Sequence, residues 1–179
     1  MGFIVFFLSC SLFKRKIYMD EFNHKKMTDK KISKLCEIWN LIGPFNMDLF
    51  GDRLVLQKKV FLLKKLGFDL GYEFHPYIRG PYCNELATDG YKIRDVIKIT
   101  GDDPCSNKSL NVLSELSKNH ENDIYWFEML ASLVYLFNEN KSISKKELKK
   151  KLFEHKPHLS DEEMFEEAYN ILKLKGLLN

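Results

Sequence analysis

The sequence predicts a mainly α fold: a compact helical bundle with a helical C-terminal lobe. Apolar residues recur at helical spacing within residues 32–42 and 56–66. Residues 124–137 are apolar on almost every side, which is typical of a helix at the centre of a fold. Two Ser-x-x-Glu patterns, beginning at Ser144 and Ser160, predict the starts of two further helices by capping boxes.

Two helices are expected in the first third of the chain. Thr28 is a suitable N-cap for the first helix, and Gly43-Pro44 should end it. The second helix should begin near Asp52 and end at Gly67, which we expect in the left-handed conformation of a helix C-terminus.

Residues 70–80 predict a short extended or β-hairpin element, because apolar and polar residues alternate loosely there. Pro76 would place such a strand at a sheet edge. Gly80-Pro81 should then force a bend, and either Cys83 or Asn84 should cap the helix that follows.

Residues 28–179 are expected to form a single helix-rich domain with lobes at 28–99 and 109–179. The polar loop at 100–108 is the best candidate for the boundary between the lobes. In the second lobe, the helix over 124–137 should be capped by Asn122 or Asp123 and should be the buried centre.

Residues 1–27 form an apolar and then basic N-terminal extension. Its first thirteen residues carry no charge, but they are too few to span a membrane as a helix. Three interpretations remain open: a start codon assigned too early, with translation from Met19 or Met27; an ordered strand or helix on the domain; or a membrane-surface or signal-anchor segment. Only the last, with residues 1–13 retained and exposed, predicts a membrane contact.

Composition points to an ordinary globular protein, with 45% hydrophobic and 30% charged residues and a net charge of +3. The charge is too small to indicate a nucleic-acid-binding domain by itself. Four widely spaced cysteines include no Cys-x-x-Cys motif, which argues against a zinc site and favours a reduced, cytoplasmic protein. We expect no metal and no cofactor, and the absence of any catalytic motif predicts a protein that is not an enzyme.

Arg53 and Gln57 lie one helical turn apart on one face and carry the main candidate site. In a structural interpretation they brace the bend, with Gln57 meeting backbone groups around Tyr77–Pro81. In a functional interpretation they help to form a small polar pocket for a peptide end or a phosphate. The candidate residues of this signature pocket are Arg53, Gln57, Tyr77, Arg79, Gly80, Pro81 and Tyr82.

A basic stretch offers an alternative site for nucleic acid. Its lysines are Lys145, Lys146, Lys149, Lys150 and Lys151, and five acidic residues follow between Ser160 and Ala168. Two solvated helix faces that attract each other would account for the pattern. A winged-helix-like DNA-binding unit would use the same lysines against phosphates.

The run Arg53-Leu54-x-Leu56-Gln57-Lys58, followed by the Gly-Pro-Tyr of residues 80–82, resembles the YwgA-like proteins. It is more distantly similar to the Panacea group, which includes SocA-like antitoxins. The match covers about residues 50–95, and Cys83 departs from the Ser that usually follows Gly-Pro-Tyr. The resemblance implies a helix-rich fold encoded near toxin or defence genes and supplies no catalytic residue.

These observations lead to two main functional hypotheses, and an enzyme whose reaction the sequence does not show stays open as a third interpretation. The first is a non-catalytic regulatory or interaction module, antitoxin-like or defence-associated, that binds a toxin-like or defence-related partner protein. The second is a winged-helix-like DNA-binding transcriptional regulator that uses the Lys145–Lys151 helix.

Overall fold

A computed structural model describes residues 30–94 and 107–179, and these residues are mainly helical. The N-terminal extension, the Thr28 cap and nearly all of the expected boundary loop lie outside the described residues. The described elements are a helix over residues 30–42, α2 (Phe50–Lys65), α3 (Asn84–Arg94), α4 (Lys108–Ser117), α5 (Ile124–Glu139), α6 (Lys145–His155), the 3-10 helix η1 (Pro157–Leu159) and α7 (Glu162–Leu174).

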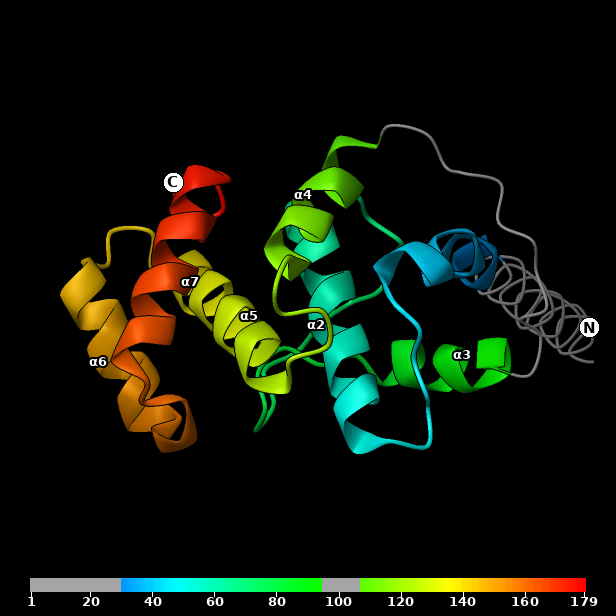
Figure 1. Cartoon of the computed structure of the whole chain (residues 1–179), viewed down its shortest axis with the longest axis horizontal. Helices are drawn as coiled ribbons and strands as arrows, with labels where there is room; N and C mark the ends of the chain where they lie inside the picture. The colour runs from blue at the N-terminus through cyan, green and yellow to red at the C-terminus, as the bar shows by residue number, and fades with distance from the viewer. Residues whose placement is uncertain (1–29, 95–106) are drawn as a thin grey trace, which may run out of the picture.

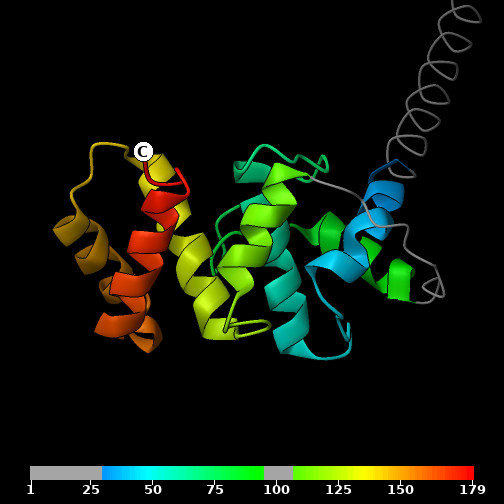
Figure 2. The ribbon, with the colours of Figure 1, turned by 45° about the horizontal axis from the view of Figure 1, so that its top comes forward.

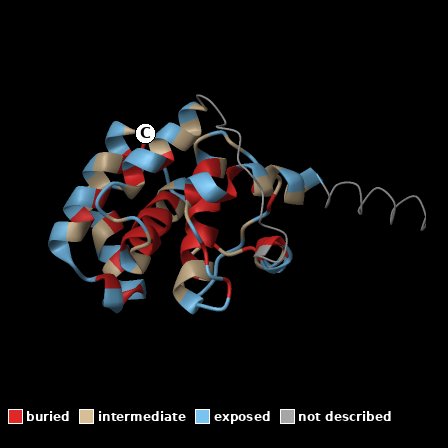
Figure 3. Ribbon diagram, turned by 45° about the vertical axis from the view of Figure 1, so that its right-hand side comes forward, coloured by how far each residue is buried: buried red, intermediate tan, exposed pale blue. Residues whose placement is uncertain are grey.

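Helices α2 and α5 lie side by side at the centre and make the most extensive helix–helix contact in the described residues (Figures 1 and 2). Helices α6 and α7 cover one side of α5, whereas α3 and residues 30–42 lie beyond α2. Buried residues concentrate on the two central helices (Figure 3). The prediction that residues 124–137 form the buried centre is confirmed, because every residue from Trp126 to Val134 is buried.

Polar side chains fix the helix starts in the C-terminal half. The Asp123 carboxylate accepts hydrogen bonds from two backbone N–H groups of α5, and Ser144 and Glu147 form the predicted capping box. The second predicted capping box is wrong. Asp161, and not Ser160, is the N-cap of α7 and accepts from the Met164 N–H, because Ser160 is taken up in the turn that closes η1.

Gly67 has a φ of +92°, and the Phe68 N–H reaches back to the Leu63 carbonyl, so α2 ends in the predicted left-handed manner. Cys83 caps α3: its Sγ accepts from the Leu86 N–H at 3.5 Å. The Cys83 thiol is therefore the cap of α3, and Asn84 is the first helical residue.

The β-hairpin expected around residues 70–80 is not supported. Among the described residues, this segment makes one isolated antiparallel bridge, between His75 and Tyr82, with two backbone hydrogen bonds of 2.9 Å. On one side of the bridge the Gly80 N–H donates to the Tyr77 carbonyl at 2.9 Å and closes the turn, and on the other side α3 begins at Asn84, so the ladder ends after one bridge. Residues 75–82 instead form a tight turn, which we call the 75–82 turn.

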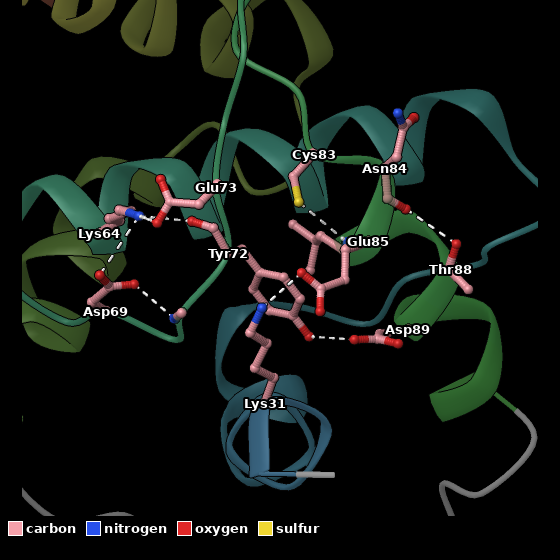
Figure 4. A network of polar contacts seen from close by, with 12 residues as sticks. Lys31, Lys64, Asp69, Tyr72, Glu73, Cys83, Asn84, Glu85, Thr88 and Asp89 are labelled. Atoms are coloured by element: carbon pink, nitrogen blue, oxygen red, sulfur yellow. Dashed lines mark hydrogen bonds and ion pairs between the residues drawn. The ribbon is translucent and has the colours of Figure 1, made fainter. Parts of the chain in front are cut away.

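A polar network attaches the first helix to α3 (Figure 4). Lys31 forms an ion pair with Glu85 at 2.7 Å and lies over the Tyr72 ring. The Tyr72 hydroxyl donates to the buried Asp89 carboxylate at 3.1 Å. Burial and then the Asp89 charge raise the pKa of Tyr72, so the phenol remains a donor.

Among residues 30–94 and 107–179, no helix combines the length and apolar character that crossing a bilayer requires.

The central position of α5 predicts a large cost for truncating its side chains. Leu130→Ala should lower the free energy of unfolding by about 2–5 kcal/mol, because Leu130 is fully buried and a cavity would remain. Leu174→Ala is the matched control, since that side chain is 80% exposed and should change stability by less than about 0.5 kcal/mol. Urea unfolding of both variants tests this, and similar losses would contradict the central role of α5.

Candidate functional site

Three consecutive polar residues of α2 are buried: Gln57, Lys58 and Lys59 are each at most 3% exposed. They interrupt an otherwise apolar stretch of α2, Leu54 to Leu63, that is buried on every side. Burying an amide or an ammonium is costly unless it finds hydrogen-bond partners. Each of the three side chains has such a partner, and each partner belongs to another segment of the chain.

Gln57 holds the end of the 75–82 turn through both ends of its side-chain amide. Its Nε2 donates to the Cys83 carbonyl at 2.9 Å, and its Oε1 accepts from the Cys83 N–H at 2.8 Å. The Gln57 side-chain amide therefore hydrogen-bonds the Cys83 backbone in the way a residue of a neighbouring β-strand would. The sequence predicted this kind of contact around residues 77–81, and the structure places it two residues further along.

The neighbouring lysines bind two carbonyl groups that no helix or sheet satisfies. Lys58 Nζ donates to the Pro81 carbonyl at 2.8 Å, within the bend. Lys59 Nζ donates to the Ile42 carbonyl at 2.7 Å, at the C-terminal end of the first helix, where the helix dipole favours a cation. Together with Gln57, these lysines fix the bend and the first helix against α2.

Glu128 on α5 is a fully buried carboxylate surrounded by basic side chains. Its oxygens lie 2.6 Å from Lys156 Nζ, 3.1 Å from Arg79 Nη1 and 3.0 Å from His158 Nε2. Burial alone would raise the pKa of Glu128, but the hydrogen bonds and charges of these partners outweigh it and hold the pKa below its ordinary value. Lys156 also donates to the Ile78 carbonyl at 3.0 Å, so the cluster holds the 75–82 turn from the α5 side.

Glycine is required where the turn approaches α5 most closely. Gly80 has a φ of +87°, and a Cβ atom there would lie 3.2 Å from Ser132 Oγ and 3.6 Å from Lys58 Nζ. Ser132 Oγ is itself buried without a hydrogen-bond partner.

A pocket of about 560 Å³ opens between the start of α2, the 75–82 turn and the start of α3. Its lining includes Phe50, Arg53, Lys58, Tyr77, Arg79 and Tyr82. The rings of Tyr77 and Tyr82 are 5.4 Å apart between centroids and tilted by 34°. We call this cavity the turn pocket.

The structure brings four of the predicted pocket residues together: Arg53, Tyr77, Arg79 and Tyr82 line the turn pocket. Gln57 does not line it, because its amide is committed to Cys83. Gly80 and Pro81 line a separate slot of about 120 Å³ beside Ser132 on α5.

The expectation that Arg53 braces the bend is wrong. Its Nη1 donates to the Met47 carbonyl at 2.8 Å, in the segment just before α2, and its guanidinium lies over the Phe50 ring. Sequence reasoning also missed Lys58 as a pocket residue. The sequence shows a pair of lysines inside an otherwise apolar helix. The same pattern is also typical of a helix edge that faces solvent, so it does not by itself indicate a pocket residue.

Acidic residues of α7 occupy part of the basic stretch on α6. Lys145 pairs with Glu166 at 2.5 Å, Lys149 pairs with Glu162, and Lys150 lies 3.8 Å from Glu154 one turn further along α6. Lys146 and Lys151 are exposed on the same helix. The geometry matches two helix faces that attract each other.

Within the described part of the chain, no group of three or more His, Cys, Asp or Glu side chains is arranged to hold a metal ion. No protein-family profile matches the chain, and no curated protein or solved structure does so at a significant level.

Replacing Gln57 should expose its bracing role. Gln57→Met keeps the side-chain volume but leaves the Cys83 N–H and carbonyl without partners, at about 1–3 kcal/mol for each buried group. Urea unfolding should show this loss, whereas Asn111→Ala on the exposed face of α4 should change little. A Gln57→Met variant as stable as the parent would rule out the brace.

Lys58 should make stability depend on pH. Burial, and then the charge of Lys156, lower its pKa from 10.5 to about 7. Between these values the unfolded chain binds the proton that the folded chain has lost, so stability rises with pH, by about 1 kcal/mol from pH 7 to pH 8. Lys58→Met should remove this rise when unfolding is measured at both pH values.

Lys59→Met is the control for that pH series. Burial lowers the pKa of Lys59 only to about 8, so this variant should keep most of the rise between pH 7 and pH 8. An unchanged rise in Lys58→Met would show that Lys58 is not the titrating group.

Proposed function

We propose that this chain is a cytoplasmic, non-catalytic regulatory module, antitoxin-like or defence-associated, that binds a partner protein through the 75–82 turn. The observation that carries the proposal is the exposure of two large apolar side chains at the tip of that turn. Tyr77 is 64% exposed and Ile78 is 78% exposed. Phe50, which is 57% exposed, lines the turn pocket together with Tyr77.

The turn that carries these side chains is held from both sides. Gln57 and Lys58 bind its backbone from α2, and Lys156 binds the Ile78 carbonyl from the end of α6. A fixed backbone loses little conformational entropy when a partner binds. Exposed aromatic residues beside arginines are also the composition typical of residues that dominate interface energies.

The partner-binding hypothesis agrees with the distant similarity to the Panacea group, which shares a Leu-Gln-Lys helix and a later Gly-Pro turn and implies a partner-neutralising role. The resemblance to the YwgA-like proteins implies no established activity. Widely spaced cysteines support a reducing compartment, and Cys36 and Cys83 are both free. The DNA-binding alternative receives less support. Three of its five lysines pair with carboxylates, and two of these carboxylates belong to the neighbouring helix α7. The phosphates of a nucleic acid would have to displace the carboxylates from the lysines.

Removing one exposed apolar side chain should weaken partner binding. A tagged chain purified from its native cells under mild conditions should retain a partner protein, and Ile78→Ser should retain at least tenfold less. The purified partner should then rebind the parent chain but not this variant. Leu174→Ser, at the exposed end of α7, is the control and should bind like the parent.

Two outcomes would contradict the proposal. One is a parent chain that elutes alone and monomeric under these conditions. The other is a partner that the Ile78→Ser and Leu174→Ser chains retain equally well.

A further inference from the structure

The turn pocket has the size of a small-molecule site. Its volume of about 560 Å³ lies within the range of about 300–1,000 Å³ that is usual for such sites. The exposed tip residue Ile78 is not part of its lining. The pocket therefore shares Tyr77 with the apolar tip to which we assign partner binding, but it does not include Ile78.

Positive charge dominates the lining of this pocket. Arg53, Lys58 and Arg79 line it, and no Asp or Glu side chain does. Glu128 compensates Arg79 from behind, but the same carboxylate also binds Lys156. Among the described residues, Lys58 Nζ contacts a neutral carbonyl, so its charge has no direct counterion there. An anion in the pocket would stabilise this buried cation.

The N-terminal end of α3 adds to the positive potential. Asn84, the first residue of this eleven-residue helix, lines the pocket. The first N–H groups of a helix have no partner within it, and the helix dipole places partial positive charge at that end. Glu85 is the acidic residue of this first turn, and Lys31 neutralises it from the first helix (Figure 4).

Flat apolar surfaces border the cationic part of the pocket. Phe50 and Tyr77 are both more than half exposed, and Tyr82 pairs with Tyr77. Aromatic rings of this kind can stack on the face of a planar ligand. A simple phosphate or carboxylate would leave these rings and much of the volume unused.

We propose that the turn pocket binds a nucleoside monophosphate, with its phosphate at Arg53, Lys58 and Arg79 and its base against Tyr77 and Phe50. Two guanidinium groups, which can each bind phosphate through two N–H donors, together with the Lys58 amine suit a phosphate dianion. This inference goes beyond partner binding and does not depend on it.

Titration calorimetry on the purified full-length chain tests the site with a series of related ligands. AMP should bind at least tenfold more tightly than adenosine, which lacks the phosphate, and than ribose 5-phosphate, which lacks the base. AMP that binds no better than ribose 5-phosphate would overturn the role of the aromatic rings. An acidic peptide that binds where AMP does not would replace the nucleotide by a peptide ligand.

Variants locate the site. Arg53→Gln should weaken AMP binding about tenfold, because Arg53 makes its hydrogen bond at the surface end of α2 and the fold should survive the change. Tyr77→Ala should weaken AMP binding without weakening ribose 5-phosphate binding. Lys146→Gln, on α6 outside the pocket, should leave binding unchanged. Equal AMP affinity in the Arg53→Gln, Lys146→Gln and parent chains would overturn the proposal.

Ile78→Ser separates this site from partner binding. The side chain of Ile78 does not line the pocket, so this variant should bind AMP like the parent chain even where it loses the partner protein. Loss of AMP binding in Ile78→Ser would show that the pocket and the apolar tip are one site.

Discussion

One buried carboxylate connects the 75–82 turn to the C-terminal helices. Glu128 projects from the central helix α5 and binds Arg79 of the 75–82 turn, Lys156 at the end of α6 and His158 of η1. These partners lie 28 to 49 residues away in the chain. Removing one member of such a buried cluster leaves uncompensated charge, which is far more destabilising than losing a surface ion pair.

The polar residues of α2 complete this arrangement from the opposite side. Gln57 and Lys58 hold the backbone of the turn, and the Glu128 cluster holds its side chains and the Ile78 carbonyl. An apolar pair of central helices would pack at lower electrostatic cost. The polar contacts instead hold the backbone of the turn, with Tyr77 and Ile78 exposed at its tip and a cationic pocket beside it. The same buried polar residues therefore determine both the shape of the 75–82 turn and the positive charge of the turn pocket.

Local patterns predicted much of the fold and part of the site. Asp123, the Ser144–Glu147 box and Gly67 end or begin helices where the sequence indicated, because caps act within a few residues. The pocket residues Arg53, Tyr77, Arg79 and Tyr82 were identified together, although the bracing role expected of Arg53 belongs to Gln57 and Lys58. The expected β-hairpin is reduced to one bridge because the chain turns between Tyr77 and Gly80 on one side of it and enters α3 at Asn84 on the other.

The sequence by itself determined which segments are helical and that α5 lies at the centre, since periodicity and capping depend on near neighbours. Only the tertiary structure decided that Lys58, Lys59 and Glu128 are buried, because a charged residue within a helix can face solvent or a distant partner with the same local pattern. The partners that make burial tolerable are Pro81, Ile42 and Lys156, and they are brought close only when the chain folds.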